Sequence, residues 1–184
     1  TMAGELWAST AWLGADREAL RPDIEALETF AACTLECLQA EHQRLFGKSV
    51  ERVSPCEATY RWKATGDILA AADDVRGWLQ QLYAQFGVAP VGETADHIAV
   101  QMEFMAYLCS LEARQWQAGT SHAARQLRRQ ESDFLADHPA QWIAEFHRQM
   151  GRQTRPSFYA AAASLAARWL TLEQGPNRVP ARAR

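Results

Sequence analysis

Apolar side chains recur every three or four residues along most of the chain, and this spacing is typical of amphipathic α-helices. Glycines, prolines and capping residues divide the pattern into separate segments. The predicted helices cover residues 5–13, 22–46, 67–86, 93–117, 121–138, 139–150 and 156–174. No stretch of useful length alternates between apolar and polar residues as a half-buried strand does. We therefore predict an all-α fold, a compact single-domain bundle of about six or seven helices.

Proline, glycine and helix-capping residues indicate where these helices begin and end. Pro22 suits the first position of a helix and Asp23 its first turn, and Gly47 would end that helix. Asp67 is a candidate N-cap, and Gly87 would end the helix that follows it. In the helix of residues 139–150, the side chains predicted to face inward are Trp142, Ile143, Phe146 and Met150.

The segment between Gly47 and Gly66 has no clear helical stripe. Loops of this length are uncommon in a compact domain and often carry function. A short helix from Cys56 to Trp62 that packs on the bundle is the other interpretation, and the two are compatible.

We place the helical domain at residues 4–175. The last segment, 176–184, contains three arginines and two prolines, and we expect a disordered basic tail there.

The composition restricts the function. Hydrophobic residues make up 48% of the chain and charged residues 22%, as in ordered globular proteins. The formal net charge of −3 argues against a nucleic-acid-binding protein, which would show a basic surplus. No apolar run reaches the roughly 20 residues that a membrane-spanning helix requires. No secretory signal is visible, so we expect a cytoplasmic protein without stable membrane insertion.

Motifs for metal or catalytic chemistry are not found. A carboxylate di-iron bundle requires a glutamate three residues before a histidine. The residues at that spacing are Gln39, Thr94, Gly119, Leu135 and Ala144. There is no His-Glu-x-x-His motif, glycine-rich phosphate loop or Gly-x-Ser-x-Gly elbow. We therefore predict no catalytic residue, no metal and no cofactor. The rival interpretation is a metal- or cofactor-binding bundle, or an enzyme, centred on Asp96 and His97.

The four cysteines do not form a recognisable metal motif. Cys33 and Cys37 share one helix face at i,i+4 spacing, but no second Cys or His pair has a matching spacing. We interpret the cysteines as small buried hydrophobic residues in a reducing cytosol. A nucleophile built from Cys56 or Cys109 with His97 is a further alternative.

The segment ETADHIAVQMEFMAYL, from Glu93 to Leu108, opens an almost wholly apolar helix with an acidic turn and one Asp-His pair. Polar groups set against a buried helix are costly unless they are satisfied or used. In the structural interpretation, the negative charge of Asp96 stabilises the N-terminus of this helix through the helix dipole, and His97 caps a neighbouring group. The functional interpretation, in which these polar groups bind a ligand, depends on a resemblance to a known protein family.

Three segments, taken in order, resemble the TorD/DmsD/NarJ family of redox-enzyme maturation chaperones. The first is HQRLFGKSVERVSPCEATY, which ends in the pattern Ser54-Pro55-x-Glu57-x-x-Tyr60. The second is ETADHIAVQMEFMAYL. The third is ESDFLADHPAQWIAEFHRQM, which contains Phe134-Leu135-x-x-His138-x-x-x-Trp142 and Phe146. The helix FYAAAASLAARWL closes the series. The resemblance covers about residues 41–172, and the order of the segments is more specific than any one of them.

The resemblance implies an all-helical, cytoplasmic and non-enzymatic chaperone. Such proteins bind the twin-arginine signal peptide of a molybdopterin oxidoreductase subunit, or the immature subunit itself. They hold it until its cofactor is loaded and so prevent premature export. The partner would be that subunit and its signal peptide. The sequence leaves open which molybdoenzyme is the client, whether peptide or subunit is the main target, and whether helix exchange forms a homodimer.

The family's hallmark, Glu-Pro-x-Asp-His, reads Glu93-Thr94-Ala95-Asp96-His97 here. Thr94 replaces the proline and can act as a helix N-cap. In the serine-proline segment, Cys56 stands where an aromatic residue is common. His138 precedes Pro139 at a helix junction, and we expect it to satisfy backbone groups there.

The resemblance favours a peptide site built on these motifs. The carboxylates of Glu93 and Asp96 could take a guanidinium group in a bidentate pair. Apolar and aromatic side chains nearby would receive the hydrophobic segment as a helix in a groove. The residues assigned to this signal-peptide site are Pro55, Glu57, Tyr60, Trp62, Glu93, Asp96, His97 and Phe104, with Met102 and Met105 offering adaptable packing.

Overall fold

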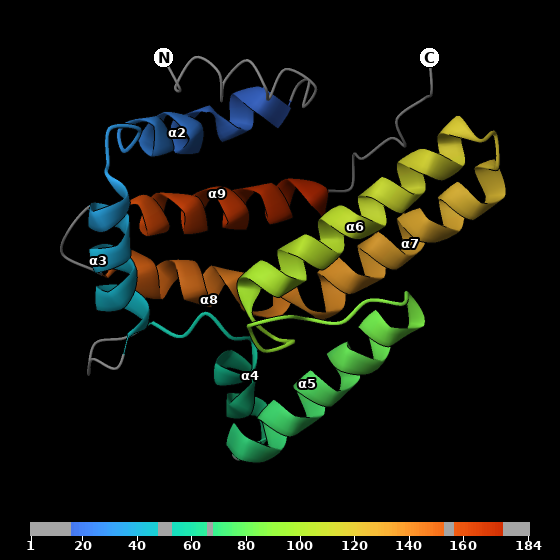
Figure 1. The fold of residues 1–184 in the computed structure, drawn as a ribbon, viewed down its shortest axis with the longest axis horizontal. Coiled ribbons are helices and arrows are strands. Elements are labelled where there is room, and N and C mark those ends of the chain that lie inside the picture. The colour runs from blue at the N-terminus through green and yellow to red at the C-terminus, as the bar shows by residue number, and fades with distance from the viewer. Residues whose placement is uncertain (1–15, 48–52, 66–67, 153–156, 175–184) are drawn as a thin grey trace. The chain divides into compact units, whose positions relative to one another are not determined.

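The helices found in the structure confirm the all-α prediction. The computed structural model describes residues 16–47, 53–65, 68–152 and 157–174 (Figure 1). Within these residues there are eight helices and no strand. They are α2 (Asp16–Glu28), α3 (Leu35–Phe46), α4 (Ala58–Thr65), α5 (Ile68–Gln85), α6 (Ile98–Gln117), α7 (Ser121–Asp137), α8 (Pro139–Gly151) and α9 (Phe158–Glu173). No helix in the described ranges is long and apolar enough to cross a membrane.

The chain divides into two compact units. One contains residues 1–54 and 143–173, and we call it the α2–α3–α9 unit. The other contains residues 55–142 and 174–184, and we call it the α4–α7 unit. Helix α8 begins in the α4–α7 unit and ends in the other one. The sequence motifs that carry the resemblance fall mostly in the α4–α7 unit.

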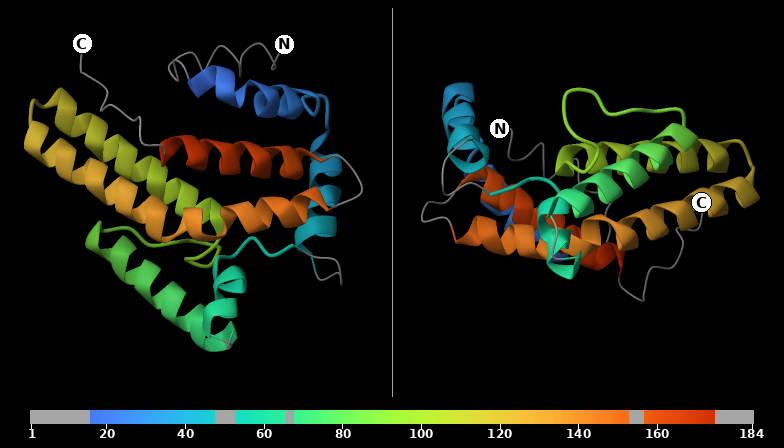
Figure 2. Two further views of the ribbon diagram at one scale, coloured as in Figure 1. Left: turned by 180° about the vertical axis from the view of Figure 1, so that it is seen from behind. Right: turned by 90° about the horizontal axis from the view of Figure 1, so that it is seen from below.

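The α4–α7 unit contains two helix pairs. α6 and α7 lie side by side as an antiparallel hairpin, and α4 contacts α5 (Figures 1 and 2). Gly119 sits in the tight turn of the hairpin with a φ of 72°, a conformation that glycine adopts without strain. The apolar stripes of α5, α6 and α7 supply the core of this unit. Its largest members include Leu79, Tyr83, Phe104, Leu108 and Phe134.

In the α2–α3–α9 unit, α2 contacts α9. Leu20 and Ile24 of α2 and Leu170 of α9 are each at most 2% exposed. The carboxylate of Asp23 accepts a hydrogen bond from Ser164 Oγ at 2.5 Å and another from Arg168 Nε. The side chain of Asp23 therefore fixes α2 to α9 through two polar contacts beside the apolar ones.

The prediction of six or seven helices was slightly too low. The predicted helix of residues 22–46 is two helices, because the chain breaks between Glu28 and Leu35. Thr34 is the reason: its side chain accepts a hydrogen bond from the Cys37 N–H, so it acts as the N-cap of α3. Pro22 lies inside α2 rather than at its first position.

The other extra helix is α4, which lies between Gly47 and Gly66. For that segment the sequence was compatible with both a loop and a short helix. Helix ends near Gly87 and Gly119 and the four inward side chains predicted for α8 are confirmed. The predicted helix of residues 5–13, the N-cap role of Asp67 and the tail of residues 176–184 lie outside the described residues and stay predictions.

Candidate functional site

The serine-proline segment and the Glu93–His97 segment pair with each other in the α4–α7 unit. An isolated antiparallel bridge joins Cys56 to His97. The Glu57 N–H donates to the Asp96 carbonyl at 3.0 Å, and the Ile98 N–H donates to the Pro55 carbonyl at 2.9 Å. Two motifs that lie about 40 residues apart in the chain thus form one short ladder, and this ladder fixes the starts of α4 and α6 against each other.

Asp96 is fully buried, and both of its carboxylate oxygens have partners within the unit. Oδ1 accepts from Arg76 Nε at 2.8 Å, and Oδ2 accepts from the Ala58 N–H at 3.3 Å. Ala58 is the first residue of α4, so the carboxylate also meets the positive end of that helix. The hydrogen bond that Arg76 donates to Asp96 raises the pKa of Arg76, which stays positively charged.

His97 is the N-cap of α6. Its backbone is extended, and Nδ1 accepts a hydrogen bond from the Ala99 N–H at 3.2 Å. His97, and not Thr94, therefore caps this helix; the Thr94 hydroxyl lies instead 3.6 Å from Cys56 Sγ. Tyr83 supports the same turn, because its hydroxyl donates to the Ala95 carbonyl at 3.0 Å.

Glu57 is the centre of a buried polar network. Its carboxylate accepts from Arg61 at 2.7 Å, from Gln101 Nε2 at 2.5 Å and from His138 Nδ1 at 3.0 Å. Because a carboxylate only accepts hydrogen bonds, Nδ1 of His138 is a donor. Gln101 Oε1 in turn accepts from Trp142 Nε1 at 3.2 Å. We call these five side chains the Glu57 network; it joins α4, α6, the α7–α8 junction and the start of α8.

Aromatic rings enclose this network. The His138 ring lies 4.4 Å from the ring of Trp78 and 5.6 Å from that of Phe134. Tyr60 stacks on Trp142 with ring centroids 5.2 Å apart. The expectation that His138 satisfies backbone groups was wrong about its side chain, which binds a carboxylate. Arg76 and Gln101 were missed, although a glutamine in an apolar helix is a usable signal of buried polar contact.

The residues assigned to the peptide site fall into different environments. Glu93 is exposed, Pro55 and Tyr60 are half-buried, and Glu57, Asp96 and Phe104 are buried. The side chain of Trp62 lies outside the described residues. Of the two methionines, Met105 belongs to the core and Met102 is partly exposed. The structure thus brings the two motifs together, and the binding role of these residues stays a prediction.

An apolar pocket lies beside the ladder. Its volume is about 270 Å³, and it lies between the end of α5, the connection to α6 and α6 itself. Its lining includes Tyr83, Val88, Pro90, Val91, Val100, Glu103, Phe104 and Tyr107. Val91 is 94% exposed, an unusual position for a branched apolar side chain that has nothing over it. Part of its lining comes from Val88–Val91, which stands just before the Glu93–His97 segment in the chain.

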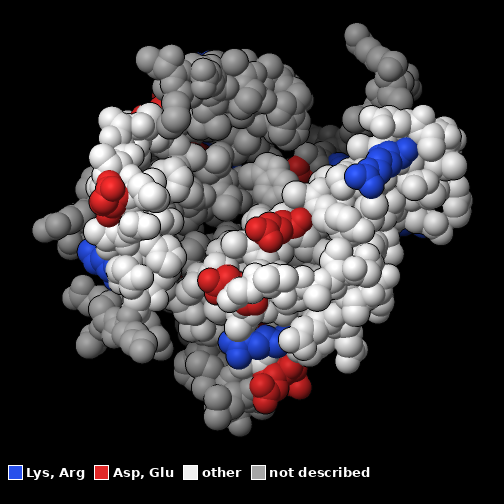
Figure 3. Space-filling model, viewed as in Figure 1, with Lys and Arg blue, Asp and Glu red and all other residues white. Residues whose placement is uncertain are grey.

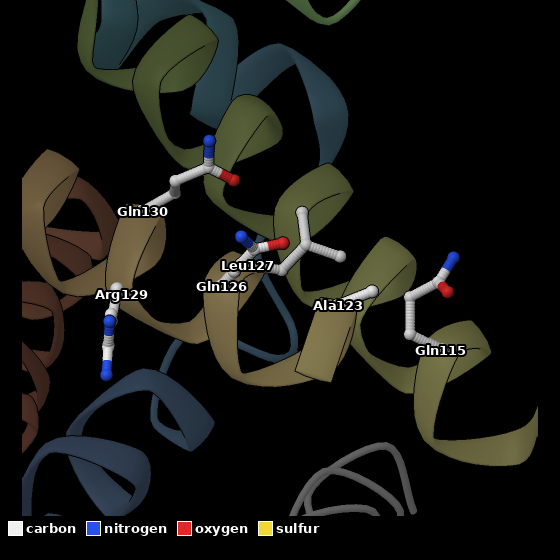
Figure 4. Close-up of a pocket in the computed structure, with 6 residues that line it drawn as sticks. All are labelled: Gln115, Ala123, Gln126, Leu127, Arg129 and Gln130. Carbon is white, nitrogen blue, oxygen red and sulfur yellow. The ribbon is translucent and has the colours of Figure 1, made fainter. Parts of the chain in front are cut away.

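A second pocket lies on the α6–α7 hairpin (Figure 4). It is lined by Gln115 of α6 and by Ala123, Gln126, Leu127, Arg129 and Gln130 of α7. Leu127 points toward α6, whereas Arg129 points away from it (Figure 4). Three of the six lining side chains are amides, and Arg129 is the one charged side chain among the six. This pocket therefore offers no defined chemistry for a ligand.

Charged side chains on the α4–α7 unit are of both signs. Figure 3 shows acidic and basic side chains interspersed over α5, α6 and the connection between them, without a continuous patch of one sign. Among the described residues, no group of three or more His, Cys, Asp and Glu side chains is placed to hold a metal ion. The expected absence of a metal and the rival centre on Asp96 and His97 both stay predictions.

The comparison with family models places the chain among the redox-enzyme maturation chaperones of the TorD and NarJ type. The family model described as nitrate reductase delta subunit matches residues 13–148, and the chain belongs to that family. Members of the family are chaperones for molybdoenzyme maturation, and they bind the catalytic subunit of such an enzyme. Neither a search of curated proteins nor one of solved structures gave a match.

Proposed function

We propose that this protein is a cytoplasmic, non-catalytic chaperone that binds the N-terminal twin-arginine signal peptide of a molybdoenzyme catalytic subunit. It would hold the subunit until the molybdenum cofactor is loaded. The family supports the role of chaperone, and the apolar pocket beside the Glu93–His97 segment supports the kind of ligand. A signal peptide combines two guanidinium groups with an apolar stretch, so its site needs both an apolar surface and carboxylates.

The apolar pocket supplies the first requirement. Val91 and Pro90 form its outer edge, and Tyr83, Phe104 and Tyr107 lie along its wall. A peptide that covered the pocket would remove the exposed Val91 side chain from water. Burying one such side chain contributes about 1.5–3 kcal/mol of transfer free energy. The exposed Val91 side chain at the apolar pocket is the observation that carries the proposal.

Exposed carboxylates near the pocket supply the second requirement. Glu103 lines the pocket and is exposed, and Glu93 is exposed two residues beyond Val91 in the chain. We assign guanidinium binding to these two side chains. Asp96 is engaged by Arg76 and the start of α4, so we assign it, with His97, the role of holding the connection in place.

The immature catalytic subunit itself is a second candidate ligand, because the family model that matches is that of the nitrate reductase delta subunit. In that case the pocket would receive an apolar segment of the folding subunit instead of the signal peptide. The two candidates use the same surface, and they differ in whether the paired arginines are needed.

Calorimetric titration separates these candidates. The probes are the twin-arginine signal peptides encoded beside this gene, each paired with a version in which both arginines are glutamine. Binding of one peptide that weakens at least about tenfold without its arginines supports the signal-peptide proposal. Equal binding of both versions, or binding only to the subunit without its signal peptide, supports the second candidate. No binding to peptides or subunit contradicts both, and bound metal found at one ion per chain would then favour the rival metal centre.

A further inference from the structure

The thiols of Cys33 and Cys37 lie next to each other at the connection between α2 and α3. Their sulfur atoms are 3.2 Å apart, closer than two unbonded sulfurs normally approach. Cys37 and Cys109 are exposed and Cys33 and Cys56 are partly exposed, so the expectation that the four cysteines are buried was wrong. A pair of accessible thiols in contact is an arrangement for redox chemistry rather than for core packing.

We propose that Cys33 and Cys37 form a redox-active dithiol, which a peroxide oxidises to an intramolecular disulfide that thiols reduce again. The proposal does not depend on the client or on the apolar pocket. It assigns a modification site to the α2–α3–α9 unit.

The backbone holds the two cysteines ready for this reaction. The Cys33 N–H donates to the Phe30 carbonyl at 2.9 Å, and the Cys37 N–H donates to Thr34 Oγ1 at 3.3 Å. A disulfide bond is about 2.05 Å long, so the sulfurs need to approach by roughly 1.2 Å. Rotation of two exposed side chains can supply such a movement without unfolding either helix.

The two thiols have different roles. Cys37 is the third residue of α3, close to the positive end of that helix. The hydrogen bond between the two sulfurs raises the pKa of Cys33, which therefore keeps its proton. Cys37 is thus the attacking group, and Cys33 resolves the intermediate.

The reaction balances with one peroxide. The Cys37 thiolate attacks one oxygen of hydrogen peroxide, the O–O bond breaks, and the departing hydroxide takes a proton to leave as water. Cys37 is now a sulfenic acid. Cys33 Sγ then attacks Cys37 Sγ, the S–O bond breaks, and the hydroxide leaves as water with the proton of Cys33. Two thiols are oxidised and one peroxide is reduced to two waters.

The other two cysteines provide internal controls. Desolvation raises the pKa of the partly buried Cys56, and desolvation with the nearby Glu131 and Glu112 raises the pKa of the exposed Cys109 to about 11. Both are therefore thiols at neutral pH and react slowly with peroxide. Thr94 is a neighbour of Cys56, and Glu131 and Glu112 lie near Cys109.

The test treats the full-length protein with hydrogen peroxide at neutral pH, alkylates the remaining thiols and maps the products by mass spectrometry. The segment that holds both cysteines should be lighter by two hydrogen atoms and carry no alkyl group, and dithiothreitol should reverse this. We expect it to react at least about tenfold faster than Cys56 or Cys109. Cys37→Ser should abolish the product, and Cys109→Ser should leave it unchanged.

Two kinds of result would overturn the proposal. One is that Cys33 and Cys37 stay alkylatable at a peroxide dose that oxidises Cys56 or Cys109. The other is that they end as separate sulfinic acids or as cross-links between two chains, which non-reducing gels would show. Because Cys37→Ser changes one exposed atom, its fold can be checked independently by circular dichroism.

Discussion

Nδ1 of His138, at the end of α7, lies 3.0 Å from a carboxylate oxygen of Glu57, which directly precedes α4. These residues are 81 positions apart in the chain. Both are almost completely inaccessible, with 5% and 0% of their side chains exposed. The contact connects the serine-proline segment to the Phe134–Trp142 segment, just as the Cys56–His97 bridge connects it to the Glu93–His97 segment. All three segments that resemble the family therefore meet within the α4–α7 unit.

The first prediction concerns the Glu57 network. Glu57→Ala leaves the donors of His138, Gln101 and Arg61 without their shared acceptor in a buried place. We expect a loss of about 2–4 kcal/mol in the free energy of unfolding, measured by urea denaturation. The matched control is Glu103→Ala, which removes an exposed glutamate from α6 and should change stability by less than about 0.5 kcal/mol. Equal effects of the two substitutions would contradict a structural role for Glu57.

The second prediction concerns Asp96 and Arg76. Asp96→Asn removes the charge that pairs with Arg76 and weakens the cap on α4, and we expect a loss of about 1–3 kcal/mol. Arg76→Gln should cost at least as much, because it leaves the Asp96 carboxylate, 0% exposed, without its counter-ion, whereas Asp96→Asn leaves an Arg76 side chain that is 38% exposed to water. A double-mutant cycle measures their coupling. Unchanged stability together with weaker peptide binding in Asp96→Asn would instead show that Asp96 contacts the client directly.

The third prediction concerns pH. Glu131 of α7 has 1% of its side chain exposed, and its Oε1 has no hydrogen-bond partner among the described residues. Burial, together with the nearby Glu112, raises the pKa of Glu131 from its ordinary value of 4.5 to about 7. The folded state therefore prefers the protonated acid, and the free energy of unfolding should fall as pH rises from about 4.5 through 7. The loss is complete above the folded-state pKa.

Glu131→Gln tests this directly. The neutral amide cannot ionise, so the variant should be more stable than the natural protein at pH 8, by on the order of 1–3 kcal/mol. The advantage should shrink as the pH falls toward 5. Urea denaturation at several pH values measures the difference, and Glu103→Gln serves as an exposed control. A difference that does not change with pH would show that Glu131 is ionised in the folded state.

The helices could be predicted because their signals are local. The stripe of α8, with Trp142, Ile143, Phe146 and Met150, repeats at the helical period, and all four are buried. The break before α3 was missed because the apolar period continues across it. The start of α3 is capped by a hydrogen bond from the Cys37 N–H to the Thr34 hydroxyl, and threonine is also tolerated inside helices.

The candidate site was harder to predict because its contacts are distant in sequence. Asp96 and Glu57 were both assigned to the peptide site, an assignment that stays a prediction, and a sequence does not show that Arg76 or His138 would be their partners. The resemblance to a family located the motifs, yet it did not distinguish groups that hold the ladder from groups that face solvent. Val91 was not recognised at all, since one exposed valine in a connecting segment leaves no periodic signal.

The central claim is that the apolar pocket beside Val91 receives the client. The most direct measurement is calorimetric titration of the signal peptide that binds best into three proteins: the natural chain, Val91→Asp and the control Leu35→Asp. Val91 is 94% exposed and Leu35 65% exposed, so neither substitution should disturb the fold, which circular dichroism will verify. We predict that Val91→Asp raises the dissociation constant at least about tenfold, while Leu35→Asp leaves it within about twofold. Unchanged affinity in a folded Val91→Asp variant would contradict the account.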